Sequence, residues 1–277
     1  MEKESTGEKY IVIREVIHKK NPRLLRWMPG FILRYLERIA HEKDINEVMN
    51  HIGHLQGLDF VDALLTQELG VEVKLEGEEH IPLEGGIIFA SNHPLGGLDG
   101  IAFMHAVGKY RQDIKFLVND ILLNIKNLQP LFVPVNTLGT QGRRNSILIE
   151  EAYADEHALL VFPAGLVSRK RNGLIHDLEW KKSFISKAKK YKKNIIPVHI
   201  DGKNSNFFYN LARFRERLGI KVNLEMLYLA DELFAQRGHQ VTIRIGEPIA
   251  YTDLDSSKSE KEWAAHIKDR VYAMAEK

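Results

Sequence analysis

The stretch Ile87–Gly100 reads IIFASNHPLGGLDG, and its order of residue types decides the fold expected around it. An apolar run that ends in polar residues and glycines predicts a short buried strand followed by a turn. Such a turn can bring the carboxylate of Asp99 back to the imidazole of His93. Histidine titrates near neutral pH, and a carboxylate on its far nitrogen fixes the tautomer and raises the basicity. The pair, preceded by Asn92, therefore indicates a general base for an alcohol, with a structural histidine in a strand-end loop as the alternative.

The composition is that of an ordinary globular protein. The chain has 277 residues, of which 44% are hydrophobic and 27% charged, enough for a sizeable core. Its formal net charge of +2 is too small to indicate a nucleic-acid partner. The absence of cysteine excludes disulfides, thiolate metal sites and a cysteine nucleophile, and is compatible with the cytoplasm. Between residues 165 and 193, ten lysines and arginines stand against two acids. This basic segment indicates either a solvated helix face or a surface for anionic lipids, phosphates or an acidic carrier protein.

Residues 1–69 are expected to form a helical segment that associates with a membrane. Residues 1–20 read as a polar lead-in without the core of a signal peptide. Helices are predicted between Pro22 and Asn50, with a break near Pro29–Gly30, and a further helix over 45–69. The first helices combine arginines with Trp27 and other large apolar side chains, which is typical of an interfacial anchor or of a helix packed on the protein's own core. No stretch approaches about 18 uninterrupted apolar residues, so no transmembrane helix is expected.

Residues 70–277 are expected to form an α/β domain. Short apolar runs predict strands over 71–75, 86–91, 114–118, 132–135, 158–162, 194–200, 223–229 and 240–245. Helices are predicted over 100–107, 120–125, 141–153, 180–192, 207–218 and 259–275. This alternation predicts a mixed, largely parallel sheet flanked by helices, with the N-terminal helices as an appendage. Sites in such sheets gather at strand ends, so the loops after Ala90 and Phe162 should face one crevice.

Three further segments carry candidate site residues. The first, 161–171, reads VFPAGLVSRKR and places Gly165, Ser168 and Arg169 after a strand, where backbone amides and an arginine can meet an anion. The second, 131–146, places Asn136 after a strand and Arg143 with Arg144 at the start of a helix, a position that favours anions. The third, 195–209, is an apolar strand followed by three aromatics, which fit an acyl channel or the core. The pair at 176–177 has no apolar strand before it, and no histidine spacing indicates a metal site.

Taken in order, these segments resemble the four sequence blocks of the glycerolipid acyltransferase superfamily. Its members transfer acyl groups from acyl carrier protein or coenzyme A to glycerol phosphate, lysophosphatidate and related lysolipids. The first block, Asn-His-x-x-x-x-Asp, implies that His93 is the general base and that Asp99 orients it. The third block, Phe-Pro-Glu-Gly-Thr-Arg-Ser, is matched in part, and the fourth is matched by the strand around Pro197. The resemblance covers roughly residues 70–250. Together with the segments above, it implies these substrate-binding residues: Asn92, Asn136, Arg143, Arg144, Phe162, Gly165, Ser168 and Arg169.

Departures from these blocks bear on the acceptor. Five residues rather than four separate His93 from Asp99, and the two glycines between them can absorb the extra residue in the turn. Asn136 stands near the usual arginine of the second block, and Ala164 replaces the glutamate of the third. Because those two positions help to hold phosphorylated glycerols in the family, the departures argue against glycerol 3-phosphate or lysophosphatidate, which remain the alternative acceptors. The variant Phe-Pro-Ala-Gly is similar to a branch often labelled as hemolysins, which includes O-acyltransferases that make ornithine or glycine lipids.

The resemblance thus implies an O-acyltransferase that acts on a lyso-amino-acid lipid. Acyl carrier protein, or coenzyme A, would carry the acyl thioester, and no permanently bound cofactor, metal or nucleic acid is implied. The carboxylate of the acceptor would pair with Arg169, or with Arg143 and Arg144, while an amide near Gly165 or in the 96–97 turn would stabilise the oxyanion. The expected location is the cytoplasm, peripheral on the inner face of the membrane, with the lipid surface and acyl carrier protein as partners. The alternatives are a non-catalytic lipid-binding protein and a hydrolase that uses the same His-Asp pair.

Overall fold

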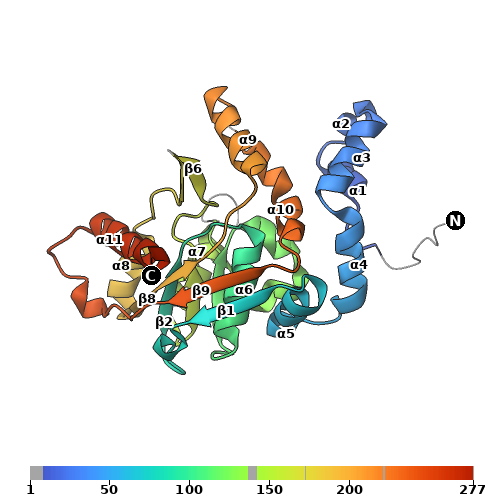
Figure 1. Cartoon of the computed structure of the whole chain (residues 1–277). Helices are drawn as coiled ribbons and strands as arrows, with labels where there is room; N and C mark the ends of the chain where they lie inside the picture. Colours follow the sequence, from blue (N-terminus) through green and yellow to red (C-terminus); the bar gives the residue numbers. More distant parts are fainter. Residues whose placement is uncertain (1–8, 137–141, 172, 221, 277) are drawn as a thin grey trace.

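A central sheet organises the part of the chain that the structure, a computed structural model, describes: residues 9–136, 142–171, 173–220 and 222–276. Seven strands of that part pair in the order β1-β9-β8-β2-β5-β3-β4. Of these, β1, β9, β8 and β2 are labelled in Figure 1. From β8 to β4 all neighbours are parallel, whereas β9 runs antiparallel to β8 and carries β1 parallel beside it. The strands are β1 (Glu72–Glu76), β2 (Ile87–Ser91), β3 (Ile114–Val118), β4 (Phe132–Pro134), β5 (Ala158–Val161), β8 (Asn194–Ile200) and β9 (Gln240–Ile245). The predicted α/β class with a mixed, largely parallel sheet is therefore confirmed.

Helices cover both faces of this sheet. One face packs on α5 (Gly57–Ala63), α6 (Gly97–Gly108) and α10 (Leu229–Ala235), and the other on α7 (Gly142–Ala154), α8 (Ser183–Tyr191) and α11 (Glu260–Ala273). Along β2, Ile87 and Phe89 enter the first layer, while Ile88 and Ala90 enter the second. A strand that is buried on both faces reads as a continuous apolar run, which explains the pattern of this segment.

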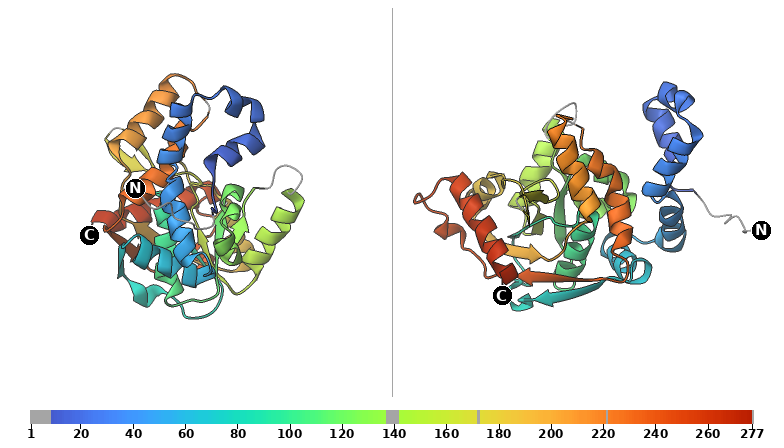
Figure 2. Two further views of the ribbon diagram at one scale, coloured as in Figure 1. Left: turned by 90° about the vertical axis from the view of Figure 1, so that its right-hand side faces the viewer. Right: turned by 45° about the horizontal axis from the view of Figure 1, so that its top comes forward.

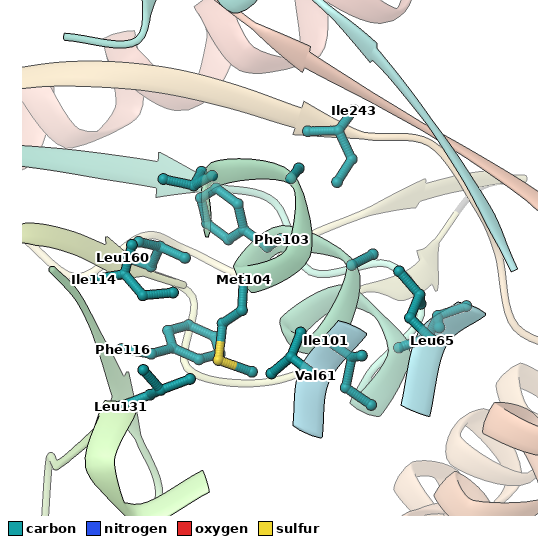
Figure 3. Close-up of a cluster of buried hydrophobic side chains, with 14 of the residues drawn as sticks. Val61, Leu65, Ile101, Phe103, Met104, Ile114, Phe116, Leu131, Leu160 and Ile243 are labelled. Carbon is teal, nitrogen blue, oxygen red and sulfur yellow. The ribbon is translucent and has the colours of Figure 1, made fainter. Parts of the chain in front are cut away.

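Helix α6 lies in the middle of the first layer, and Figure 3 shows its side chains Phe103 and Met104 beside Phe116 of β3. The helix is buried along almost its whole length and, apart from Asp99 and His105, has only apolar residues, as expected of a core helix. At Gly100 a Cβ would lie 2.9 Å from the ring of Phe116, so only glycine allows this close approach. The tight packing fixes the first turn of α6, which carries Asp99.

The N-terminal helices project from the body on the side of α10 (Figures 1 and 2). They are α1 (Ile13–Lys20), α2 (Pro22–Trp27), α3 (Gly30–Ile39) and α4 (Glu42–Ile52), so the predicted break near Pro29–Gly30 is confirmed. The hydroxyls of Tyr35 and Tyr228 lie 2.5 Å apart, and the imidazole of His41 contacts Asp231 at 3.0 Å. These contacts join the projecting helices to the α/β body.

Two predictions for the N-terminal region were wrong. Residues 13–20 form a helix instead of a lead-in, because Glu42 of α4 accepts a hydrogen bond from the backbone N–H of Ile13 at 2.8 Å and stabilises the helix start. The predicted helix over 45–69 is interrupted between Ile52 and Gly57. There the side chain of Asn127 donates hydrogen bonds to the carbonyls of residues 53 and 55, at 2.9 and 2.7 Å. Both outcomes depend on tertiary partners.

Further along the chain, the strand predicted over 223–229 was also wrong. The segment forms the helical turn η5 (Leu224–Tyr228), which leads into α10. A short apolar run fits a strand or a helical turn equally well, and here the turn lets Glu225 reach two buried arginines. Sequence reasoning also missed the small antiparallel hairpin of β6 (Arg169–Arg171) and β7 (Leu174–His176), which lies beside α9 (Asn206–Arg217) (Figure 1). The remaining helical turns are η1 (Leu64–Glu68), η2 (Glu78–His80), η3 (Asp120–Asn124), η4 (Lys126–Leu131), η6 (Tyr251–Asp253) and η7 (Met274–Glu276).

Candidate active site

The candidate site lies where the neighbouring parallel strands β2 and β5 end. Because their carboxyl ends meet at one edge of the sheet, the loops that follow Ser91 and Val161 lie side by side. The ring of Phe162 stacks on the imidazole of His93, with 4.1 Å between ring centroids and 15° between the planes. The structure thus brings together the two loops that the sequence analysis placed in one crevice.

His93 and Asp99 are in direct contact. Nδ1 of His93 lies 2.8 Å from Oδ2 of Asp99, which also accepts the backbone N–H groups of Leu95 at 2.8 Å and Gly96 at 2.9 Å. Gly96 has φ of +78° and ψ of −116°, a conformation that a side chain would strain, and Asp99 is the third residue of α6. The glycine turn therefore absorbs the additional residue between the histidine and the aspartate.

Burial sets the electrostatics of this pair. The side chain of Asp99 has no solvent exposure, and burial raises the pKa of its carboxyl group, while the hydrogen bonds from His93 and from the two amides oppose that rise. Its other oxygen, Oδ1, is buried without a hydrogen-bond partner among the described residues. A carboxylate that lacks solvation gains most from a positive charge on its neighbour. The contact therefore places the carboxylate of Asp99 where its charge can stabilise a proton taken up by His93 in the reaction.

The second ring nitrogen of His93 is the one that can meet a substrate. Among the described residues, the structure records a hydrogen-bond partner for Nδ1 and none for Nε2, and 16% of the side chain is exposed. A carboxylate on Nδ1 places the proton on that nitrogen and leaves Nε2 as the acceptor. The arrangement can therefore remove a proton from a hydroxyl group placed at Nε2.

Asn92 holds two strand ends together. Its side-chain amide donates to the carbonyl of Ile200 at 2.9 Å and accepts the backbone N–H of the same residue at 2.7 Å. Asn92 is 2% exposed, so it extends the pairing of β2 with β8 by one step. The structure thus gives Asn92 a role in positioning the His93 loop, where the sequence analysis expected a substrate ligand.

Asp177 organises the back of the loop and was passed over by sequence reasoning. It accepts a hydrogen bond from the backbone N–H of His93 at 3.2 Å, one from the hydroxyl of Ser168 at 2.5 Å and one from the indole of Trp180 at 2.8 Å. Ser168 also donates its backbone N–H to the carbonyl of His93 at 2.8 Å. Both Ser168 and Asp177 are buried, so they position His93 through its backbone. No local pattern in the sequence links Asp177 to a residue 84 positions away.

Arg169 is not free to bind an acceptor carboxylate in this structure. Its guanidinium is buried and donates to Glu225 at 2.9 Å, and Arg215 binds the same carboxylate at 3.0 Å. Burial lowers the pKa of Arg169, and the charge of Glu225 opposes that shift. The structure thus places Arg169 in a buried ion cluster with Glu225 and Arg215, where the sequence analysis expected a substrate ligand.

The remaining predicted ligands lie at different distances from His93. Arg143 and Arg144 are exposed in the first turn of α7, and Asn136 is exposed after β4, with its carbonyl accepting from Asn145 at 2.6 Å; residues 137–141 lie outside the described part. Strand β4 stands three positions from β2 in the sheet, a separation of about 14 Å at the usual strand spacing. Asn136 therefore lies well away from His93, and among the described residues no contact joins Arg143 or Arg144 to the His93 loop.

Gly165 lies closer, after β5, and it brings in a cation that sequence reasoning missed. Its φ is +68°, its N–H donates to the carbonyl of Phe162 at 3.0 Å, and a Cβ there would lie 3.1 Å from Nζ of Lys181. The exposed Lys181 is held by its backbone N–H, which donates to Pro163. The N–H groups of Gly165 and Gly96 are engaged, so of the expected oxyanion donors the N–H of Gly97 in the 96–97 turn stays a prediction. The ammonium group of Lys181 lies at the Gly165 loop, which follows β5.

The surroundings of the site are simple. A cavity of about 240 Å³ lies behind the loop, where its lining includes Asn92, Ser168, His199 and Tyr272. The imidazole of His93 does not line it, so we do not assign this cavity to the reaction. Within the described ranges, no three His, Asp or Glu side chains are grouped as metal ligands, and no helix has the length and apolar character needed to span a bilayer.

Comparisons with known proteins identify the family of the chain. A family model described as Acyltransferase matches residues 15–277. A lyso-glycine lipid O-acyltransferase from Bacteroides thetaiotaomicron is 42% identical over 95% of this chain and 97% of that protein. A protein with the same description from Phocaeicola vulgatus is 39% identical over 95% of each chain. Among solved structures, a 1-acyl-sn-glycerophosphate (LPA) acyltransferase from Thermotoga maritima covers 97% of this chain and 94% of its own, with a TM-score of 0.49 and 18% identity. The chain belongs to the acyltransferase family.

Proposed function

We propose that this acyltransferase moves a fatty acyl group from a thioester donor to the hydroxyl group of a lyso-amino-acid lipid, with lyso-glycine lipid as the first candidate. The contact between His93 and Asp99 at the end of β2 carries the proposal for the reaction. The acceptor is supported by the two relatives named lyso-glycine lipid O-acyltransferase, which match nearly the whole chain. Ornithine lipid is the second candidate in the same chemical class.

The proposed reaction is a direct transfer. Nε2 of His93 takes the proton of the lipid hydroxyl while the oxygen attacks the thioester carbonyl. Asp99 holds the imidazolium that results. The tetrahedral intermediate then collapses, the C–S bond breaks, and the thiolate takes the proton from His93. The products are an ester and a free thiol, so the reaction needs no covalent acyl-enzyme.

Lys181 replaces Arg169 as the proposed partner of the acceptor's carboxylate. Its ammonium group lies over Gly165, in the loop that follows the strand next to β2. A lysine ammonium pairs with a carboxylate as a point charge and keeps its hydration, which suits an exposed position. Arg143 and Arg144 stay in the proposal as outer cations that attract an anionic lipid surface.

The donor, the partners and the location are further parts of the proposal. Acyl carrier protein or coenzyme A supplies the thioester, and the exposed cations Arg171, Lys189 and Lys192 favour an acidic donor. The enzyme binds as a peripheral protein to the inner face of the cytoplasmic membrane. This is supported by Trp27, which is 84% exposed, and Phe31, which is 66% exposed, among arginines on α2 and α3.

Lipid mass spectrometry tests the proposed function. Cells that express the wild-type chain are compared with cells that express His93→Ala, and with a control, His157→Ala, that makes the same change before β5 at the opposite edge of the sheet. We expect diacylated glycine or ornithine lipid in the wild type and the control, and its loss in His93→Ala. Phosphatidate as the product would overturn the proposed identity of the acceptor. Thioester consumption without a new lipid would indicate a hydrolase, and lipid binding without transfer would indicate a non-catalytic protein.

A further inference from the structure

Helix α9 carries two apolar faces, and the protein itself covers one of them. Phe208 and Tyr209 are buried and pack with Val167. On the other side, Phe207 is 54% exposed and Phe214 is 61% exposed. These two side chains are seven positions apart and therefore lie on one side of the helix. One apolar face, packed on the protein body, is what an ordinary amphipathic helix has. The exposed apolar face of α9 therefore calls for a second partner.

The exposed apolar face continues past the end of α9. We define the α9 surface as Phe207, Phe214, Leu218, Val222 and Leu227, whose exposed fractions lie between 54% and 67%. The ring of Phe207 packs edge-on against Tyr228, which follows Leu227, with centroids 4.9 Å apart. Large apolar side chains scattered singly over a surface are common, but several in one short segment mark an interaction site.

The α9 surface stays outward because a buried ion cluster fixes the segment. Arg215 points inward from α9 and binds Glu225 of η5 at 3.0 Å, and it also donates to the carbonyl of Ile220 at 2.9 Å. Arg169 of β6 binds the same carboxylate at 2.9 Å. A buried carboxylate shared by two arginines thus ties α9, η5 and β6 together.

Its charges suit an anionic lipid surface. Arg213 and Arg217 are exposed on α9, next in sequence to Phe214 and Leu218, and outnumber the one exposed acid of that stretch, Glu216. Aromatic and aliphatic side chains flanked by arginines are typical of segments that lie in the interface of an anionic bilayer. A protein partner as acidic as a carrier protein would satisfy the arginines, but it would not need five exposed apolar side chains.

The place of α9 in the fold favours the same partner. A Cβ at Gly96, in the turn after His93, would lie 3.5 Å from Val167 and 2.8 Å from Leu229, so the layer under α9 and α10 packs directly on the site loop. In Figures 1 and 2, α9 and the N-terminal helices project on the same side of the body. A membrane that meets both would deliver a lipid beside the site.

We propose that the α9 surface is a second contact with an anionic bilayer, separate from α2 and α3, so that the enzyme rests on the membrane at two points. This inference rests on the proposed action on a membrane lipid. It adds a named surface for bilayer binding outside the reaction site.

Single cysteine labels test the proposal, because the chain contains no cysteine of its own. An environment-sensitive fluorophore is placed at Leu218→Cys, at Trp27→Cys and, as a control, at Leu83→Cys. Leu83 is 74% exposed in the loop that precedes β2, at the other edge of the sheet. Each protein is mixed with vesicles of phosphatidylglycerol and phosphatidylethanolamine that contain brominated acyl chains. We expect the labels at 218 and 27 to be quenched and the label at 83 to stay unquenched.

The outcomes separate this inference from the proposed function, which acyl transfer in detergent micelles measures without a bilayer. Transfer in micelles with quenching at 27 and none at 218 overturns the inference and leaves the function intact. A label at 218 that responds to acyl carrier protein and not to vesicles also overturns it. Failure of transfer in micelles contradicts the function itself.

A charge substitution measures the contribution of the surface. Phe214→Glu should weaken vesicle binding by about tenfold or more, because it removes apolar area that the bilayer would bury and adds repulsion from anionic lipids. The matched change Leu83→Glu should leave vesicle binding unchanged, and both variants should keep the micellar activity of the wild type. Equal vesicle binding by Phe214→Glu and the wild type would overturn the proposal.

Discussion

Functional roles were predicted for both the loop 92–99 and the basic segment 165–193. The two regions differ in how far other residues of the chain already pair with their polar and charged groups. In the loop, one carboxylate and one imidazole meet, and the imidazole keeps a nitrogen available. In the basic segment, carboxylates from distant parts of the chain neutralise Arg169, Lys182, Lys187, Lys190 and Lys193. A dense run of cations therefore does not identify a ligand site until the acidic partners within the protein are known. A His-Asp pair in which Nε2 has no partner among the described residues does indicate a candidate general base.

The largest effect on stability should follow removal of the carboxylate that serves two buried arginines. Glu225→Gln keeps the shape of the side chain but leaves Arg169 and Arg215 without a counter-charge in the interior. We expect the free energy of unfolding to fall by about 3–5 kcal/mol. Urea unfolding followed by circular dichroism measures this change. A loss below about 1 kcal/mol would mean that water reaches the cluster and that Arg169 of the basic segment does not need Glu225 as its counter-charge.

A large effect on activity, with little on stability, should follow Asp99→Asn. The amide oxygen can still accept from Leu95 and Gly96, but the group can no longer stabilise an imidazolium. We expect kcat to fall by about 10- to 1,000-fold, less than for loss of the base itself. The melting temperature, measured beside the rate, shows whether the fold is kept. Wild-type activity in a folded variant would mean that another carboxylate orients His93.

A moderate effect on acceptor binding should follow Lys181→Gln. An exposed ion pair contributes at most about 1 kcal/mol, so KM for the lysolipid should rise by up to about fivefold while kcat stays close to wild type. Lys182→Gln is the control, because the neighbouring lysine pairs with Glu260 at 3.6 Å and lies away from Gly165. Equal KM values for the two variants would remove Lys181 from the site.

The smallest effect should follow Glu150→Gln, because Glu150 is an exposed partner of the basic segment. Hydrogen bonds from Lys187, Tyr191 and Lys190 lower the pKa of Glu150 to about 2. Because the folded-state pKa is depressed, the stabilisation is present above pH ~4.5 and is lost as the pH falls toward 2. Solvent screening keeps it under about 1 kcal/mol. Unfolding of both proteins at pH 7 and pH 3 tests this, and a constant difference between the two pH values would contradict it.

The sequence predicted the centre of the site because its parts are local. His93 and Asp99 lie six residues apart, on a strand end and a helix start that hydrophobic pattern and glycine positions can locate. The central strands β2 and β5 were predictable for the same reason, since each is an apolar run with both faces covered. Strands β1 and β9 at the side of the sheet were predictable from alternating apolar residues.

The rest depended on contacts between distant segments. Asp177 reaches His93 across 84 residues, and Arg169 meets Glu225 across 56, so neither role leaves a trace in the local pattern. The helical turn of η5 and the break after Ile52 are likewise decided by partners elsewhere in the chain, Arg215 and Asn127. Local pattern could locate the base but could not distinguish an available cation from a neutralised one.

The most direct test of the central claim is the rate of acyl transfer by purified His93→Ala, measured from the diacylated product with lyso-glycine lipid and an acyl thioester donor. His93 packs on Phe162 at the surface of the core, so the variant should keep its far-ultraviolet circular dichroism and melting temperature. The account predicts that kcat/KM falls by about 100- to 10,000-fold or more. A folded His93→Ala variant that forms product at close to the wild-type rate would contradict it.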